Sequence, residues 1–178
     1  MADMTILARR GILATVFVTG AIVLVTEVAA TRILAPYFGT TIYSVSSILG
    51  VILAALSCGY YFGGRFADRH PEPRWFFTII AAGGLALLLL RAATSLLLPV
   101  FGYFFSFIEG PLVWSMFLFF LPCFLLGALS PFAIALRQKQ QPQKGAGLVS
   151  GEVFFWSTTG SIAGSLVHEL KNPVGVIL

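Results

Sequence analysis

Charged side chains are scarce in this chain of 178 residues, because aspartate, glutamate, lysine and arginine together make up only 10% of it. A soluble domain usually carries about 25%. Hydrophobic residues make up 58%, and the mean hydropathy is +0.93. So little polar surface excludes an ordinary water-soluble domain and indicates a protein whose solvent is lipid.

Cysteine is scarce too: Cys58 and Cys123 are the only two, and both lie inside apolar stretches. No cysteine and histidine spacing matches a zinc site, so we interpret both as small buried hydrophobic residues. We expect no cofactor and no metal. Basic runs interleaved with exposed aromatic residues are also lacking, so we expect no nucleic acid partner.

Long apolar runs dominate what is present. They predict an all-α, polytopic bundle of about five transmembrane helices, of roughly 20 residues each, within residues 1–167. The predicted helices are residues 11–34, 42–64, 75–98, 112–136 and 152–167. Residues 101–108 are aromatic and suit an interfacial segment. Residues 168–178 form a tail for which the sequence predicts no element.

Lysine and arginine gather in the connections on one side of this predicted bundle. They are Arg9, Arg10, Arg65, Arg69, Arg74, Arg137, Lys139 and Lys144. The connections after the first and third helices hold none, so the rule that positive loops stay inside places the N-terminus in the cytoplasm. We expect a multi-pass protein of the cell (inner) membrane, of a bacterial type.

Three ionisable residues fall within predicted membrane helices: Glu27, Arg32 and Arg91. Glu27 and Arg91 both lie about 16 residues into their helices, roughly 24 Å from the cytoplasmic end. Their matching depth predicts an ion pair between them, whereas Arg32 can extend to the outer interface. The pair could be structural, or part of a site for a cationic or zwitterionic solute.

Two further segments are candidates. A cytoplasmic turn contains Gly64, Arg65, Asp68 and Arg69, where Asp68 can cap a helix start or pair with either arginine. It is similar to the loop between the second and third helices of major-facilitator transporters, although Pro71 replaces a glycine of that pattern. The fifth predicted helix carries a polar face with Glu152, Ser157 and Thr158, which suits hydrogen bonds between helices. Its GxxxG sequence at Gly160, and another at Gly59, predict close helix packing within the bundle.

Residues 27–40, 59–69 and 151–164 together resemble the membrane domain of spermidine synthase-like proteins, also described as fused transporter/spermidine synthases. The first block, EVAATRILAPYFGT, is the most specific of the three. The resemblance implies membrane helices that precede a domain transferring an aminopropyl group from decarboxylated S-adenosylmethionine to putrescine. This chain has no alternating strand–helix region and no aspartate pair for a diamine, so no catalytic residue is carried over.

We therefore expect a membrane anchor, or a module that handles an amine or polyamine. In either case we expect the chain to have no catalytic activity by itself. A transporter-like half that works as an oligomer, and an accessory subunit of a larger membrane complex, are the alternatives. The expected partners are the lipid bilayer, a second copy or larger complex, and a polyamine or other cationic solute.

Residues 168–173, HELKNP, resemble the phosphoacceptor box of sensor histidine kinases, in which His168 would be phosphorylated. A kinase also needs a dimerisation hairpin and an ATP-binding domain, and the predicted topology places this tail outside the cell. We interpret the box as a chance match, or as a truncated or joined reading frame.

Overall fold

A computed structural model describes residues 2–170, which form helices and short connections without a strand among them. The elements are α1 (Ala2–Phe38), α2 (Ile42–Arg69), α3 (Pro73–Leu96), α4 (Leu98–Phe101), the 3-10 helix η1 (Gly102–Phe104), α5 (Gly110–Gln140) and α6 (Ala146–Leu170). The predicted all-α fold is confirmed. The last three residues of α6 belong to the predicted tail, and the remaining residues 171–178, with the second half of the kinase-like box, lie outside the described residues.

Four helices are long and apolar enough to cross a membrane: α1 from Gly11, α2, α3 and α5. Their number and length are those of a multi-pass integral membrane protein. The sequence predicted about five such helices. The exception is α6, which has 25 residues but carries serine, threonine and Glu152 along its length. These polar residues lower the mean hydropathy of α6, although the helix is long enough to cross a membrane.

Most helix ends differ from the predicted ones, and every difference but one lengthens a helix; the exception is the end of α3, at Leu96 and not at residue 98. α2 continues through Gly63 and Gly64 to Arg69, so the predicted polar loop 65–74 is reduced to residues 70–72. α6 begins at Ala146 and not near residue 152. α1 passes Pro36 and ends at Phe38, where Gly39 adopts φ +70°. A glycine in the left-handed region is a common helix terminator. Thr41 then caps α2 by accepting a hydrogen bond from the Ser44 backbone N–H at 3.2 Å.

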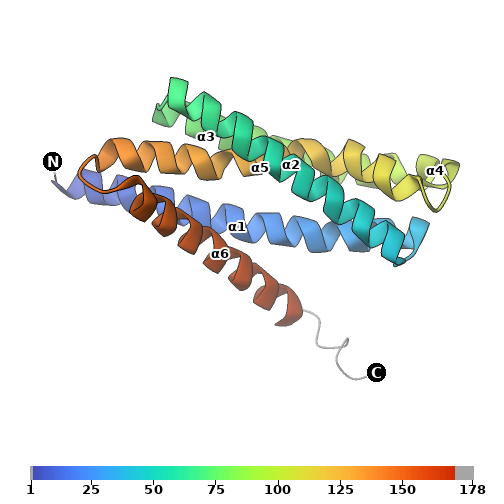
Figure 1. Ribbon diagram of the computed structural model, residues 1–178. Coiled ribbons are helices and arrows are strands. Elements are labelled where there is room, and N and C mark those ends of the chain that lie inside the picture. Colours follow the sequence, from blue (N-terminus) through green and yellow to red (C-terminus); the bar gives the residue numbers. More distant parts are fainter. Residues whose placement is uncertain (1, 171–178) are drawn as a thin grey trace.

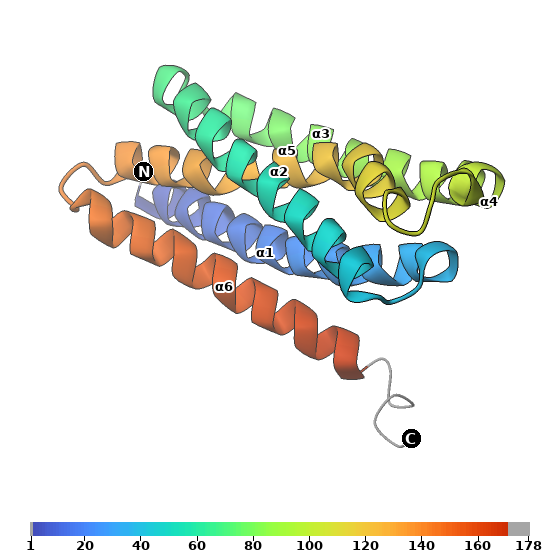
Figure 2. The same cartoon turned by 45° about the vertical axis from the view of Figure 1, so that its right-hand side comes forward.

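α5 lies at the centre of the bundle and is the most buried of the four candidate spans. Figure 1 shows α3 on one side of α5 and α1 on the other, with α2 crossing α5 diagonally and α6 beyond α1. The turned view in Figure 2 keeps this order, with α6 running along α1. Proline does not end α5, although Pro122 and Pro131 both lie inside it. Such prolines are tolerated in membrane helices because neighbouring groups satisfy the freed carbonyls.

Glycines make the two closest helix contacts possible. A Cβ built on Gly59 would collide with the carbonyl oxygen of Phe124, which brings α2 and α5 backbone to backbone. A Cβ on Gly160 would collide in the same way with the carbonyl oxygen of Phe17 on α1. Ser161 Oγ adds a hydrogen bond of 3.0 Å to the carbonyl oxygen of Gly20. The prediction that both GxxxG sequences pack within the bundle is therefore confirmed.

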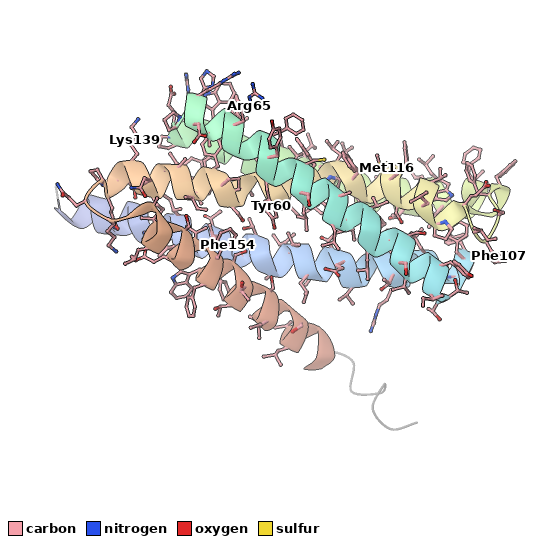
Figure 3. All side chains as sticks on the ribbon, in the orientation of Figure 1. Tyr60, Arg65, Phe107, Met116, Lys139 and Phe154 are labelled. Atoms are coloured by element: carbon pink, nitrogen blue, oxygen red, sulfur yellow. The ribbon has the colours of Figure 1, made fainter. Side chains whose placement is uncertain are left out.

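The connections at the two ends of the bundle differ in charge. Figure 3 shows Arg65 and Lys139 at one end and Phe107 at the other. The first end, which we name the basic end, carries Arg65, Arg69, Arg74, Arg137, Lys139 and Lys144. Lys139 Nζ reaches the carbonyl oxygen of Pro71 at 3.4 Å, so the α2–α3 and α5–α6 connections are neighbours. This agrees with the prediction that both basic connections share one side.

Candidate functional site

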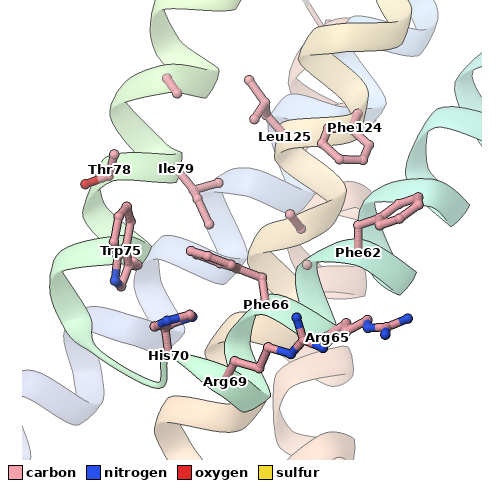
Figure 4. Close-up of a pocket in the computed structure, with 13 residues that line it drawn as sticks. Phe62, Arg65, Phe66, Arg69, His70, Trp75, Thr78, Ile79, Phe124 and Leu125 are labelled. Carbon is pink, nitrogen blue, oxygen red and sulfur yellow. The ribbon is translucent and has the colours of Figure 1, made fainter.

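A groove at the basic end, between α2, α3 and α5, is a concave feature with room for a ligand. Its volume is about 770 Å³. Its lining consists of Phe62, Gly63, Arg65, Phe66, Arg69, His70, Trp75, Thr78, Ile79, Ala82, Phe124, Leu125 and Ala128. Figure 4 shows that the aromatic and aliphatic side chains form its walls, with the two arginines and the histidine together at one edge. We name this feature the α2–α3–α5 groove.

Close packing of α2 on α5 positions the walls of this groove. A Cβ on Gly63 would lie 2.6 Å from the Cα of Ala128, so the two helices touch at this level. From there Phe66 reaches across and packs edge-on against Trp75 of α3, with ring centroids 5.3 Å apart. The ring of His70 lies 5.2 Å from that of Phe66. An aromatic cluster of Phe66, His70 and Trp75 therefore lies beside the cationic edge of the groove.

Among the side chains that the structure describes, no carboxylate pairs with the cationic edge. Arg65 and Arg69 are four residues apart on α2, which places them on the same face of the helix. Asp68 is exposed and, among the described residues, forms no ion pair with either of them. The predicted pairing of Asp68 is therefore wrong. The physical reason is that these residues lie in the last turns of a helix, not in a folded-back loop. Gly64 also lies inside α2, where a Cβ would be 3.6 Å from Pro131.

A buried ion pair joins α5 to α6 at the basic end of the bundle. Arg137 is completely buried, and its guanidinium donates to the carboxylate of Glu152. Lys144 Nζ lies 2.9 Å from the other carboxylate oxygen. We name these three residues the α5–α6 clasp. Glu152 was predicted in the first turn of its helix, which is wrong, because α6 begins six residues earlier. In its second turn the carboxylate instead faces the end of α5.

The structure does not bring Glu27 and Arg91 together. Glu27 is half-buried on α1, within electrostatic range of the buried Cys123 of α5. Arg91 is exposed on α3, which packs chiefly against α5. Between these two described residues no ion pair forms, so the predicted pair is wrong. An equal depth in the membrane was necessary for this ion pair but not sufficient, because α5 lies between α1 and α3. Arg32 is exposed near the opposite end, as its predicted position near the interface requires.

The predicted polar face of α6 divides between two environments. Ser157 is half-buried, and its carbonyl oxygen would meet a Cβ added to Gly20. Thr158 is exposed. Hydrogen bonding between α6 and α1 is instead carried by Ser161. The polar residues of α6 therefore contribute to packing on the side that faces α1, and not on the exposed side that carries Thr158.

Sequence reasoning missed both the groove and two members of the clasp. Arg137 and Lys144 had been interpreted only as positive charge on a cytoplasmic loop. One signal could have identified them, since Glu152 is the single carboxylate between residues 110 and 167 and follows three cations closely. Trp75 and Phe66 gave no such signal, because aromatic residues near the ends of membrane helices are common.

Comparison with protein families, with curated proteins and with solved structures returned no match to this chain. Among the described residues, histidine, cysteine, aspartate and glutamate form no group of three that could hold a metal ion.

Proposed function

We propose that this chain is the non-catalytic membrane module of a spermidine synthase-like protein and acts as an anchor. One observation carries the proposal: each of the three segments that resemble that family contributes to the packing or termination of a helix of the bundle. An anchor requires a stable membrane fold and no reacting groups of its own. Segments whose residues serve helix packing suit that role.

Each of the three segments has an identifiable packing role. Residues 27–40 complete α1 and contain Gly39, which ends it. Residues 59–69 hold α2 against α5 through Gly59 and Gly63. Residues 151–164 hold α6 against α1 through Gly160 and against α5 through Glu152.

Purification of the tagged full chain from its native membrane in mild detergent tests this function. We expect a soluble aminopropyltransferase to copurify, and the eluate to transfer aminopropyl groups from decarboxylated S-adenosylmethionine to putrescine. After the partner is stripped by salt, the chain should be inactive yet remain in membranes washed with carbonate. Activity of the stripped chain, or an eluate without any aminopropyltransferase, would contradict the proposal.

A transporter-like half acting as an oligomer is the second candidate, and Glu27 favours it. An ionisable residue inside a membrane helix is costly and often marks a solute path. Glu27 has no ion-pair partner among the residues whose side chains are described. Uptake of labelled polyamine into vesicles, lost in Glu27→Gln and kept in Arg91→Gln, would support transport. Absence of uptake by the unmodified chain would count against it.

A further inference from the structure

The α2–α3–α5 groove combines an apolar interior with a cationic edge. Phe62, Phe66, Ile79 and Leu125 are among its walls, whereas its charged lining residues are arginines. A ligand that matches both parts must have an apolar body and an anionic head. The volume of the groove, about 770 Å³, is within the range of small-molecule pockets.

Within residues 11–167, apart from residue 103, no carboxylate pairs with the arginines at this edge. Asp68 is exposed and pairs with neither Arg65 nor Arg69 within the described part of the chain. Glu72, the next carboxylate, is engaged by Arg74 at 2.5 Å. Like charges four residues apart on a helix repel each other, so an anion between the two guanidinium groups would relieve that repulsion.

A hydrogen-bond donor also lies unused beside the groove. Trp75 Nε1 is buried and makes no hydrogen bond to any described residue. Figure 4 shows this nitrogen on the side of the indole ring that faces His70, toward the cationic edge. Because a buried N–H without a partner is destabilising, an acceptor oxygen from a bound molecule would satisfy it.

The position of the groove selects a lipid over a soluble anion. It opens at the basic end of three helices that are long and apolar enough to cross a membrane, where lipid headgroups meet the protein. Basic pockets of this kind between membrane helices bind anionic headgroups. A second groove, of about 470 Å³ between α1, α3 and α5, offers a contrast, because none of its lining residues is charged.

We propose that the α2–α3–α5 groove binds an anionic phospholipid. Its phosphate lies between Arg65 and Arg69, and an acyl chain extends along Phe66, Trp75 and Ile79. The bound lipid fills the space between α2 and α3 and fixes the basic end at the level of the headgroups. This goes beyond the anchoring function, which requires membrane insertion but no selectivity for a lipid class.

Quenching of Trp75 fluorescence by brominated lipids tests the proposal directly. The full chain carrying Trp114→Phe and Trp156→Phe is reconstituted into phosphatidylcholine vesicles with increasing fractions of brominated phosphatidylglycerol. We expect half-maximal quenching at a lower fraction than with brominated phosphatidylcholine. Each arginine near an anionic headgroup contributes about 1 kcal/mol, so Arg69→Gln should raise the half-saturating fraction about fivefold.

Matched controls separate the site from general attraction. Lys139→Gln removes one positive charge from the same end outside the groove and should leave the half-saturating fraction unchanged. Ala82→Phe fills the groove and should weaken quenching by the anionic lipid with both arginines in place. Unchanged quenching by brominated phosphatidylcholine in Arg69→Gln would show that the bundle is intact.

Three results would overturn the proposal: equal quenching by both lipids, an equal effect of Lys139→Gln and Arg69→Gln, or loss of quenching on adding inorganic phosphate. The last result would mean that the arginines bind free phosphate without an acyl chain. None of the three would bear on the anchoring function, whose test is copurification of a transferase.

Discussion

Removing the carboxylate of the α5–α6 clasp should destabilise the protein strongly. In Glu152→Gln, the completely buried Arg137 would lose the carboxylate to which its guanidinium donates, while the side-chain volume stays almost the same. Breaking a buried pair by removing one partner costs about 3–5 kcal/mol. The Glu152 side chain is 25% exposed, so water can partly replace it, and we expect a loss of about 3 kcal/mol, at the lower end of that range.

The other two members of the clasp should respond differently. Lys144 is 35% exposed, so Lys144→Gln should cost no more than about 1 kcal/mol, as partly exposed pairs do. Arg137→Met combined with Glu152→Gln removes both charges and keeps an unbranched side chain in the buried position. Because no uncompensated charge is then buried, the double variant should recover most of the lost stability.

Unfolding in mixed micelles with increasing sodium dodecyl sulfate measures these differences through tryptophan fluorescence. Trp156 is a suitable reporter, since its ring centroid lies 6.4 Å from that of Phe17 across the α1–α6 contact. Glu109→Gln, an exposed carboxylate at the opposite end, is the control and should change stability by less than about 0.5 kcal/mol. A loss below about 1 kcal/mol for Glu152→Gln, or no recovery in the double variant, would refute this reasoning.

Three further predictions concern helix packing and the membrane interior. Gly160→Leu should separate α6 from α1 and reduce stability by several kcal/mol, measured in the same unfolding assay, because its Cβ would collide with the α1 backbone. Gly151→Ala, which meets nothing within 4 Å, should be neutral or stabilising by up to about 1 kcal/mol. Gly63→Leu should abolish the close α2–α5 approach and lower the yield of monodisperse protein in detergent, whereas Gly50→Ala should not. Glu27→Gln should leave stability unchanged or raised, since no ion pair between described residues is lost; a large loss would mean that its charge holds the fold.

Apolar length and charge asymmetry made the helical fold predictable. The apolar run from Gly11 has few alternatives to a helix in lipid, because a membrane-spanning segment must satisfy its own backbone hydrogen bonds. The glycine spacing at Gly59 and Gly160 was similarly informative, since close packing is its main use in such helices. Local sequence did not predict where helices end. Gly63 and Gly64 suggested a break, but contact with α5 keeps α2 helical as far as Arg69.

The candidate site depended on tertiary arrangement and could be predicted only in part. Depth along a helix was readable for Glu27 and Arg91, but the order of helices around α5 was not, and that order separates them. Arg65 and Arg69 were recognised as a motif, yet their role at the edge of a groove requires Trp75 from the next helix. Glu152 was named from the sequence as part of a polar helix face, whereas its ion-pair partners Arg137 and Lys144 depend on the turn that returns α6 to the end of α5.

Thiol labelling of the connections tests the central claim most directly: four apolar helices cross the membrane with both basic connections on one side. Single cysteines replace Thr40, Glu72 or Gln143 in a chain without Cys58 and Cys123, and intact cells are treated with a maleimide that cannot cross membranes. Our account predicts labelling at position 40 alone, and labelling at 72 and 143 only after the cells are opened. Labelling of 72 and 143 from opposite sides of the membrane would contradict it.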